Sequence, residues 1–197
     1  MNVNEIIEKI GPLFDVHNDD EHVEVEMRLG RKVQGAFFDT NVTKPVFDKA
    51  MRALRKFKGW ETIRTSTADV FYHDAGGIRL SVDCETGEQT MVQKLNLARE
   101  DFVLADCPLD LRFSISKEIP ASGEYEMDRK RSKHRYSFVR KNLSIDLTVS
   151  SGDTVDKDDE DPNTYQIELE IVDPGAVACQ EELFNIVHKV NDLFACL

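Results

Sequence analysis

The sequence predicts an α+β protein, mainly β, in which about eight antiparallel strands form one sheet and three helices pack on its outside. Between residues 60 and 172, apolar and polar side chains alternate in short runs, as on strands with one buried face. Three other segments carry apolar residues at helical spacing, so each has an apolar stripe to bury. With 197 residues, 41% of them hydrophobic, we expect a single domain over residues 1–197.

The chain begins with a helix, a strand and a second helix. Thr43 and Pro45 predict the start of the second helix, with the threonine as its cap and the proline in the first turn. The expected bounds of these three elements are 4–14, 22–29 and 43–59.

Strands and turns follow up to residue 173, so the sheet core is expected over 22–173. The acidic segment 152–163 predicts a solvated hairpin loop, and an apolar stripe predicts a closing helix over 176–197. The remaining strands are predicted at 62–67, 70–73, 78–82, 89–97, 109–116, 133–139, 143–150 and 165–171.

The polar faces of these strands leave two architectures open. On the strand near residue 112, for example, Arg112, Ser114 and Ser116 share one face, opposite an apolar face. An open antiparallel sheet with one face in water accounts for this pattern. A closed eight-stranded barrel also accounts for it, and it gives three apolar helices a surface to cover. In the barrel the charged faces point inward.

Composition excludes several classes of function. The net charge of −12, from 25 basic and 37 acidic residues, argues against broad binding to duplex DNA. No run of apolar residues is long enough to cross a membrane. The four cysteines are scattered and form no CxxC pair, which indicates reduced thiols and an intracellular protein.

Two glutamate pairs near opposite ends of the chain indicate a cation site. Glu24 and Glu26 share a strand face, and so do Glu168 and Glu170, because alternate residues of a strand point the same way. If the two strands meet in one sheet, four carboxylates converge. Such a cluster needs shared protons or a cation, and oxygen ligands suit Mg²⁺ or Mn²⁺.

A basic strand provides the opposite charge. Residues 129–141 contain seven lysines and arginines and no acid, and Arg131, Lys133, Arg135 and Ser137 share a face. Cations spaced about 6.6–6.8 Å apart along a strand suit a chain of phosphates. Cations that protect an exposed edge strand would look similar. Together with the glutamate pairs, however, this strand favours a site for a metal ion and a polyphosphate.

These motifs resemble a known family. Glu24-Val-Glu26 with Arg28, the strand Arg131-x-Lys-x-Arg-x-Ser137, and Ile167-Glu-Leu-Glu170 are similar to the three signature motifs of the fungal and viral metal-dependent RNA triphosphatases. These mRNA-capping enzymes belong to the triphosphate tunnel metalloenzymes. The resemblance spans residues 23–172, and the chain is most similar to the stand-alone enzymes of large algal DNA viruses.

The resemblance implies an eight-stranded antiparallel tunnel that hydrolyses the γ-phosphate of 5′-triphosphate RNA. It implies that Glu24, Glu26 and Glu170 ligate Mg²⁺ or Mn²⁺, and that Glu168 positions the attacking water or acts as its base. The basic side chains implied to clamp the γ-phosphate are Lys133, Arg135 and Arg112.

Other residues receive supporting roles by the same resemblance. Asp146 is expected to orient a basic side chain, with a surface aspartate as the alternative, and Ser137 to support the basic strand. The candidates for further phosphate contacts, or for balancing the acids, are Arg79, Lys94, Arg131 and Arg28.

Two positions do not follow the family pattern directly. Gln166 stands where fungal relatives usually have a further glutamate, which puts one ionic contact in doubt. A family glutamate on a middle strand could match Glu118, Glu124 or Glu126, and spacing does not decide among them.

The expected partners are the 5′-triphosphate end of nascent RNA, nucleoside triphosphates as side substrates, and a separate guanylyltransferase. Two alternatives stay open. One is a triphosphatase of the same superfamily that acts on inorganic triphosphate, thiamine triphosphate or nucleotides. The other is a non-catalytic barrel that binds anions, although such a barrel has no need for four convergent glutamates.

Overall fold

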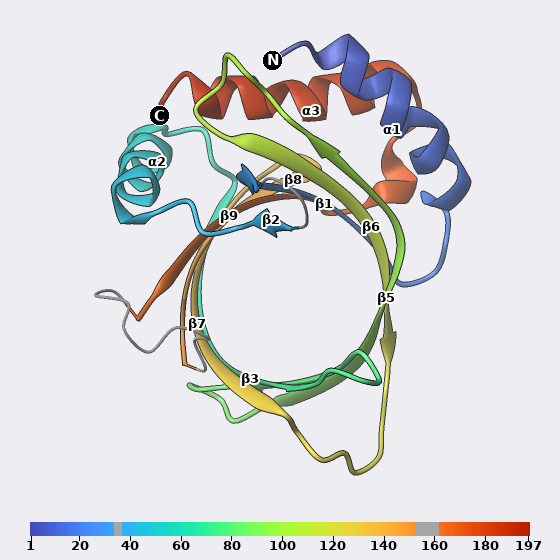
Figure 1. The fold of residues 1–197 in the computed structure, drawn as a ribbon, viewed down its shortest axis with the longest axis vertical. Helices are drawn as coiled ribbons and strands as arrows, with labels where there is room; N and C mark the ends of the chain where they lie inside the picture. The colour runs from blue at the N-terminus through green and yellow to red at the C-terminus, as the bar shows by residue number, and fades with distance from the viewer. Residues whose placement is uncertain (34–36, 153–161) are drawn as a thin grey trace.

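The computed structural model describes residues 1–33, 37–152 and 162–197, and its centre is a closed barrel of eight antiparallel strands (Figure 1). The order around the barrel is β1-β6-β5-β4-β3-β7-β8-β9, and β9 pairs with β1 to close it. This confirms the predicted fold class and decides for the barrel over the open sheet. The barrel strands are β1 (Val23–Lys32), β3 (Thr62–His73), β4 (Ile78–Asp83), β5 (Gln89–Phe102), β6 (Asp110–Pro120), β7 (Arg129–Arg140), β8 (Leu143–Ser151) and β9 (Thr164–Ile171).

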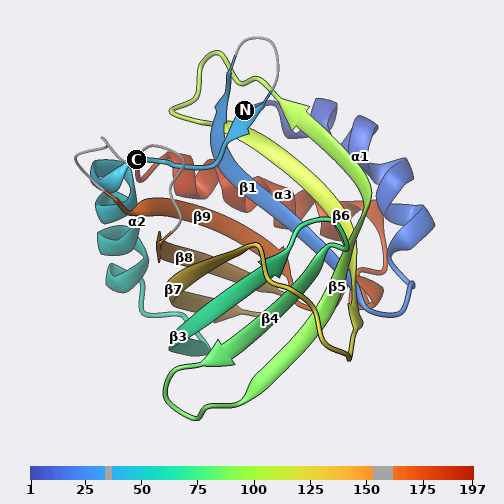
Figure 2. The same ribbon diagram turned by 60° about the horizontal axis from the view of Figure 1, so that its bottom comes forward.

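The helices cover one side of the barrel. They are α1 (Val3–His17), α2 (Lys44–Lys56) and α3 (Gln180–Phe194), with a short 3₁₀ helix, η1 (Pro174–Ala176), before α3. Figures 1 and 2 show them over the wall that contains β1, β6, β8 and β9. The outward side chains of this wall are buried beneath them; Val25, Leu111 and Leu169 are 0% exposed. Among the described residues, no helix is long and apolar enough to span a membrane.

The lower wall in Figure 1, around β3, has no helix over it among the described residues. Its outward side chains are correspondingly exposed, as Ile63 on β3 shows with 57% of its surface accessible. The apolar core of the molecule therefore lies between the helices and one half of the barrel wall. The other half separates the lumen from solvent by the thickness of the sheet alone.

Several strands differ from their predicted bounds; β6 ends four residues later and β7 begins four residues earlier than predicted. The segments 62–67 and 70–73 form one strand, β3, because β7 pairs with all of it from Thr62 to Tyr72. A two-residue strand, β2 (Phe38–Asp39), pairs with the end of β1 and was not predicted. Strand β5 continues five residues beyond the predicted end, past a bulge between Asn96 and Ala98.

The helix predictions need smaller corrections. Thr43 stands at the N-cap position of α2, but its side chain makes no capping hydrogen bond, and its φ of 66° is in the left-handed region. Its backbone N–H donates instead to Asn41 Oδ1 at 3.3 Å. The closing helix starts at Gln180 rather than at 176, because η1 precedes it. The acidic segment 153–161, predicted to be a solvated loop, lies outside the described residues.

Candidate active site

The pairing of β1 with β9 brings the two glutamate motifs together. Glu26 lies directly opposite Glu170, and Arg28 lies opposite Glu168. The apolar neighbours of these residues point outward beneath the helices and are buried. The charged side chains therefore point into the lumen.

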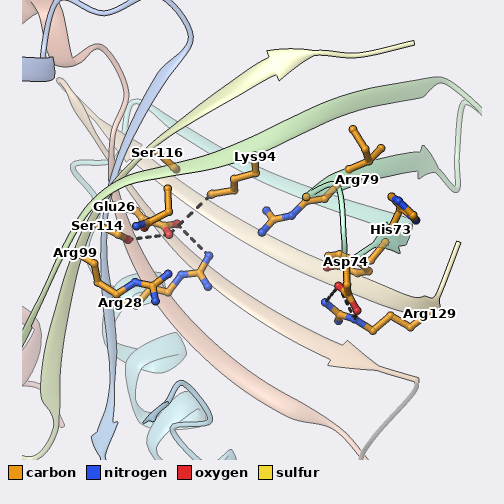
Figure 3. Close-up of a pocket in the computed structure, with 14 residues that line it drawn as sticks. Glu26, Arg28, His73, Asp74, Arg79, Lys94, Arg99, Ser114, Ser116 and Arg129 are labelled. Atoms are coloured by element: carbon orange, nitrogen blue, oxygen red, sulfur yellow. Dashed lines mark hydrogen bonds and ion pairs between the residues drawn. The ribbon is translucent and has the colours of Figure 1, made fainter. Parts of the chain in front are cut away.

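A cavity of about 240 Å³ opens beside this cluster. Figure 3 shows two groups of side chains around it. One group surrounds Glu26 and includes Arg28, Lys94 and two serines of β6. The other lies at the β3–β4 hairpin and includes His73, Asp74, Arg79 and Arg129, with Tyr72 also lining the cavity.

Lysine and serine side chains hold the first glutamate pair. The ammonium group of Lys94 donates to Glu24, and it lies 3.9 Å from Glu26 Oε1. The Ser116 hydroxyl donates to Glu24 at 3.0 Å, and the Ser114 hydroxyl donates to Glu26 at 3.1 Å. Lys94 is largely buried, yet the carboxylates around it raise its pKa against the effect of burial. These contacts with residues of β5 and β6 orient the carboxylates of both glutamates.

Guanidinium groups hold Glu168. Arg28 Nε lies 3.0 Å from one carboxylate oxygen, without hydrogen-bond geometry, and Arg135 lies 3.8 Å from the other. Burial opposes ionisation of Glu168, but the charges of Arg28, Arg135 and Lys133 hold its pKa below the usual range. Arg135 also pairs with Asp146 at 3.3 Å. Asp146 is 3% exposed and accepts a hydrogen bond from Ser144, so it is not a surface aspartate.

Glu170 is the carboxylate that lacks such support. Within the described ranges, no lysine or arginine lies at ion-pair distance from it, and burial together with the charges of Glu24, Asp146 and Glu26 raises its pKa to about 7. A positive charge placed beside Glu170 would therefore stabilise the ionised form of its carboxyl group.

The donor set fits a hard divalent cation. The carboxylates of Glu24, Glu26 and Glu170 offer only oxygen ligands, as Mg²⁺ and Mn²⁺ prefer. In the described residues, however, no three acidic, histidine or cysteine side chains are gathered closely enough to hold a metal ion as they stand. Lys94 lies against one oxygen of Glu24 and Arg28 against one oxygen of Glu26, so a metal ion bound there would compete with these two side chains.

The basic strand lies across the lumen on β7. Among the described residues, Lys133 has no carboxylate at ion-pair distance. Arg131 contacts Thr164 at 3.3 Å through one terminal nitrogen, while its buried Nε has no hydrogen-bond partner within the described part of the chain. Buried donors without partners are rare in proteins and are suited to an anionic ligand.

Of the predicted site residues, Glu26, Arg28, Arg79 and Lys94 line the cavity, and the others are not part of its lining. Three positions outside this lining have other neighbours. Arg112 makes a two-point ion pair with Asp101, at 2.7 and 3.0 Å, and does not line the cavity. Ser137 lies opposite Asp146 on β8 and does not line the cavity either. Gln166 donates its side-chain amide to Thr40 at 2.9 Å.

The structure also separates the three candidate middle-strand glutamates. Glu118 lies on β6, 3.3 Å from Lys94 and 3.6 Å from Arg79. Glu124 and Glu126 lie exposed in the connection between β6 and β7. Of these three glutamates, only Glu118 therefore forms ion pairs with residues that line the cavity.

Arg99, Asp101 and Tyr72 face the lumen and were not predicted. Continued alternation from Lys94 would turn Arg99 outward, but the extra residue of the β5 bulge reverses the order, and Arg99 lies opposite Ser114. Arg99 lines the cavity, and no ion pair involves it in the part of the chain that is described. No signal in the sequence marks the bulge itself.

A closed eight-stranded antiparallel barrel, with facing glutamates and a row of basic side chains in its lumen, has the architecture of the triphosphate tunnel proteins. The family model described as "mRNA capping enzyme, beta chain" matches residues 5–192, so the chain belongs to this family. No curated protein matches the chain by sequence.

Solved structures support the fold. The S. pombe Pct1 RNA triphosphatase superposes with a TM-score of 0.80 and 18% identity, over 98% of this chain and 93% of that one. A second structure of Pct1, in complex with the Spt5 CTD, matches equally well. The Mimivirus capping enzyme triphosphatase superposes with a TM-score of 0.68 and 16% identity, over 99% of this chain and 96% of that one.

Proposed function

We propose that this protein is an RNA 5′-triphosphatase of mRNA capping, which hydrolyses the γ-phosphate of triphosphate-ended RNA to leave a diphosphate end. The observation that carries this proposal is the closure of the barrel by β1 and β9, which sets two glutamate pairs in the same lumen as the basic strand β7. Such a lumen can hold a metal ion and a polyphosphate side by side. The family to which the chain belongs supports the same conclusion.

Glu24, Glu26 and Glu170 would hold Mg²⁺ or Mn²⁺. The metal, when bound, supplies a positive charge that neutralises phosphate oxygens and so favours attack at phosphorus. Lys94 bonds to Glu24 in the structure, and it would turn to the phosphates once a cation takes its place.

Glu168 would position the attacking water. Its two oxygens lie against Arg28 and Arg135, and a carboxylate held by two guanidinium groups stays ionised and accepts a hydrogen bond in a fixed direction. Lys133 and Arg135 would clamp the γ-phosphate and stabilise the charge of the transition state. Arg131 and Arg79 would contact the remaining phosphates.

Arg112 is the predicted clamp residue that the geometry supports least. Its guanidinium is already paired with Asp101 and lies 4.7 Å from the centroid of the Phe38 ring. It would act indirectly, by fixing β5 against β6 beside Arg99. Ser137 and Asp146 would support Arg135 and its strand.

Further parts of the proposal concern partners and organisation. Nucleoside triphosphates would be side substrates, since their triphosphate offers the same charges. A separate guanylyltransferase would take the diphosphate-ended RNA, and the protein would act inside the cell as one domain over residues 1–197.

Release of labelled phosphate from γ-labelled triphosphate RNA, with Mg²⁺ or Mn²⁺, tests the proposal. Inorganic triphosphate is assayed beside it, because a small-molecule triphosphatase of the same fold is the second candidate. Hydrolysis of RNA supports the capping function. Hydrolysis of inorganic triphosphate without RNA hydrolysis favours the second candidate.

A further inference from the structure

Tyr72 is an aromatic residue in the lumen that belongs to none of the sequence motifs. It lies on β3, lines the cavity and is 7% exposed. Its cross-strand neighbours are Arg79 on β4 and Arg129 on β7. The hydroxyl group of a buried tyrosine usually has a hydrogen-bond partner.

Three positive charges surround the Tyr72 ring. The Arg129 guanidinium carbon lies 4.1 Å from the ring centroid, and the corresponding carbon of Arg79 lies 5.7 Å from it. Lys133 Nζ is also 5.7 Å from the centroid. Positive groups at these distances are attracted to the face of an aromatic ring, which offsets part of their mutual repulsion.

Lys133 reaches the ring from further along its strand. Its direct partner on β3 is Ala68, two inward-facing positions from Tyr72. The small alanine side chain leaves room for the lysine to extend along the lumen. Among the described residues no carboxylate pairs with Lys133, so Tyr72 is the contact that fixes its ammonium group.

The positive groups around the ring also act on the hydroxyl group of Tyr72. Burial opposes ionisation, but the charges of Lys133, Arg79 and Arg129 and a hydrogen bond with Lys133 hold the pKa of Tyr72 below its usual range. This hydrogen bond and the ring contact join the same two side chains, Tyr72 and Lys133.

We propose that Tyr72 is a positioning residue that sets the place of the Lys133 ammonium group for the triphosphate. The inference rests on the proposed function, in which Lys133 contacts the γ-phosphate. A lysine has a flexible stem, and a phosphate clamp needs its charge in one place before the substrate arrives. The Tyr72 hydroxyl and ring supply that restraint without the carboxylate that would neutralise the charge.

The test is a double-mutant cycle of Tyr72→Phe and Lys133→Ala, with phosphate release measured from triphosphate-ended RNA. Phenylalanine keeps the ring and removes only the hydroxyl group. We expect Tyr72→Phe to lower kcat about 10- to 150-fold, the range that follows from a hydrogen bond to a charged group, with KM changed less than about twofold. In the Lys133→Ala background the same change should have no further effect.

Tyr136→Phe is the matched control. Tyr136 lies on β7 with its ring against His134 and Arg55, away from the cavity lining, and this variant should keep wild-type kcat. An unchanged kcat in Tyr72→Phe overturns the proposal. An equal loss in the Lys133→Ala background, or a lower melting temperature that accounts for the loss, also overturns it.

Failure of the proposed function has a different signature. If the wild-type protein releases no phosphate from RNA, the cycle is measured on inorganic triphosphate, by hydrolysis or by equilibrium binding. Coupling between Tyr72 and Lys133 in that assay supports the positioning role even though the RNA substrate is wrong. Absence of coupling overturns the role for either substrate.

Discussion

Glu26 and Glu170 lie opposite each other where β1 pairs with β9, and each is a proposed ligand of the cation. We expect Glu26→Ala or Glu170→Ala to lower kcat at least about 100-fold, because each removes a ligand oxygen from the site. The fold should persist, since neither side chain supports the apolar core.

Glu8→Ala, on the exposed face of α1, is the control and should leave the rate unchanged. Steady-state phosphate release and circular dichroism check both expectations. Near-normal turnover in either lumen variant would show that the cation site is assigned to the wrong residues.

Arg99 provides a second prediction at the scale of a residue. It lines the cavity beside Arg28 and Ser114 and has no carboxylate at ion-pair distance in the described part of the chain. We therefore expect Arg99→Ala to raise KM for triphosphate-ended RNA about 3- to 10-fold with little change in kcat, as for a group that binds substrate without acting in the transition state.

Arg52→Ala, on the exposed face of α2, serves as the comparison, and initial rates over a range of RNA concentrations separate KM from kcat. A fall in kcat at constant KM would place Arg99 in the chemical step instead.

Strands β5 and β6 are tied by an ion pair whose strength depends on pH. The hydrogen bonds from Arg112, opposed by partial burial and assisted by Lys32, lower the pKa of Asp101 to about 2. A carboxyl group with a lowered pKa in the folded state adds stability above its unfolded pKa, and this contribution is lost as the pH falls toward 2.

Asp101→Asn should therefore destabilise the protein at pH 6, and the difference from wild type should shrink between pH 4 and pH 2. Urea unfolding at a series of pH values measures that difference. A difference that stays constant down to pH 2 would mean that the ion pair does not contribute.

The helices cover one half of the barrel wall and leave the other half exposed. Similar substitutions in the two halves should therefore lower the free energy of unfolding by different amounts. Leu169 on β9 is 0% exposed between its two glutamate neighbours, whereas Ile63 on β3 is 57% exposed. Leu169→Ala should lower the free energy of unfolding by about 2–5 kcal/mol, because it leaves a cavity in the core. Ile63→Ala should cost less than about 0.5 kcal/mol. Similar losses in urea unfolding would contradict the one-sided core.

The strand pattern could be predicted because alternation places charged and apolar residues on opposite faces. Glu24 and Glu26 face the lumen for that reason, and Val25 between them is buried beneath the helices. Two features could not be predicted in this way. Ala68 and Asp69 have low strand propensity and lie between the two strands predicted at 62–67 and 70–73, yet both pair with β7 and form part of β3. The β5 bulge adds one residue, and the alternation beyond it points the opposite way.

The register between neighbouring strands determines which charged side chains form ion pairs. For this reason the site could be predicted less fully than the fold. Arg112 belongs to a strand with the expected alternation. The bulge in β5 places Asp101 opposite it, and the Arg112 guanidinium group pairs with that carboxylate. Glu118 could be separated from Glu124 and Glu126 only when the end of β6 was known. Spacing along one strand carries no information about the neighbour across the sheet.

In the whole molecule, several charges of the lumen pair with one another, although Glu170, Lys133 and Arg99 have no ion-pair partner among the described residues. Lys94 bonds to Glu24, Arg28 lies between Glu26 and Glu168, and Arg135 pairs with Asp146. Acids and bases that are paired in this way are not available to a metal or to a phosphate chain. A cation that binds these glutamates would compete with Lys94 and Arg28, and a triphosphate that binds these basic groups would compete with the glutamates.

This exchange predicts reciprocal coupling between the metal and the triphosphate. Each ligand frees groups that the other needs, so each should raise the affinity for the other by the same factor, about 5- to 150-fold. Calorimetric titration of Mg²⁺, with and without a non-hydrolysable nucleoside triphosphate analogue, measures one side of the linkage, and the reverse titration measures the other. Magnesium binds the analogue directly in solution, so that equilibrium must be measured separately and subtracted. Lys94→Met removes the competing ammonium group and should strengthen the binding of Mg²⁺ alone while it reduces the coupling. Affinities for Mg²⁺ that do not depend on the analogue, in wild type and in this variant, would mean that the paired charges do not exchange partners when ligands bind.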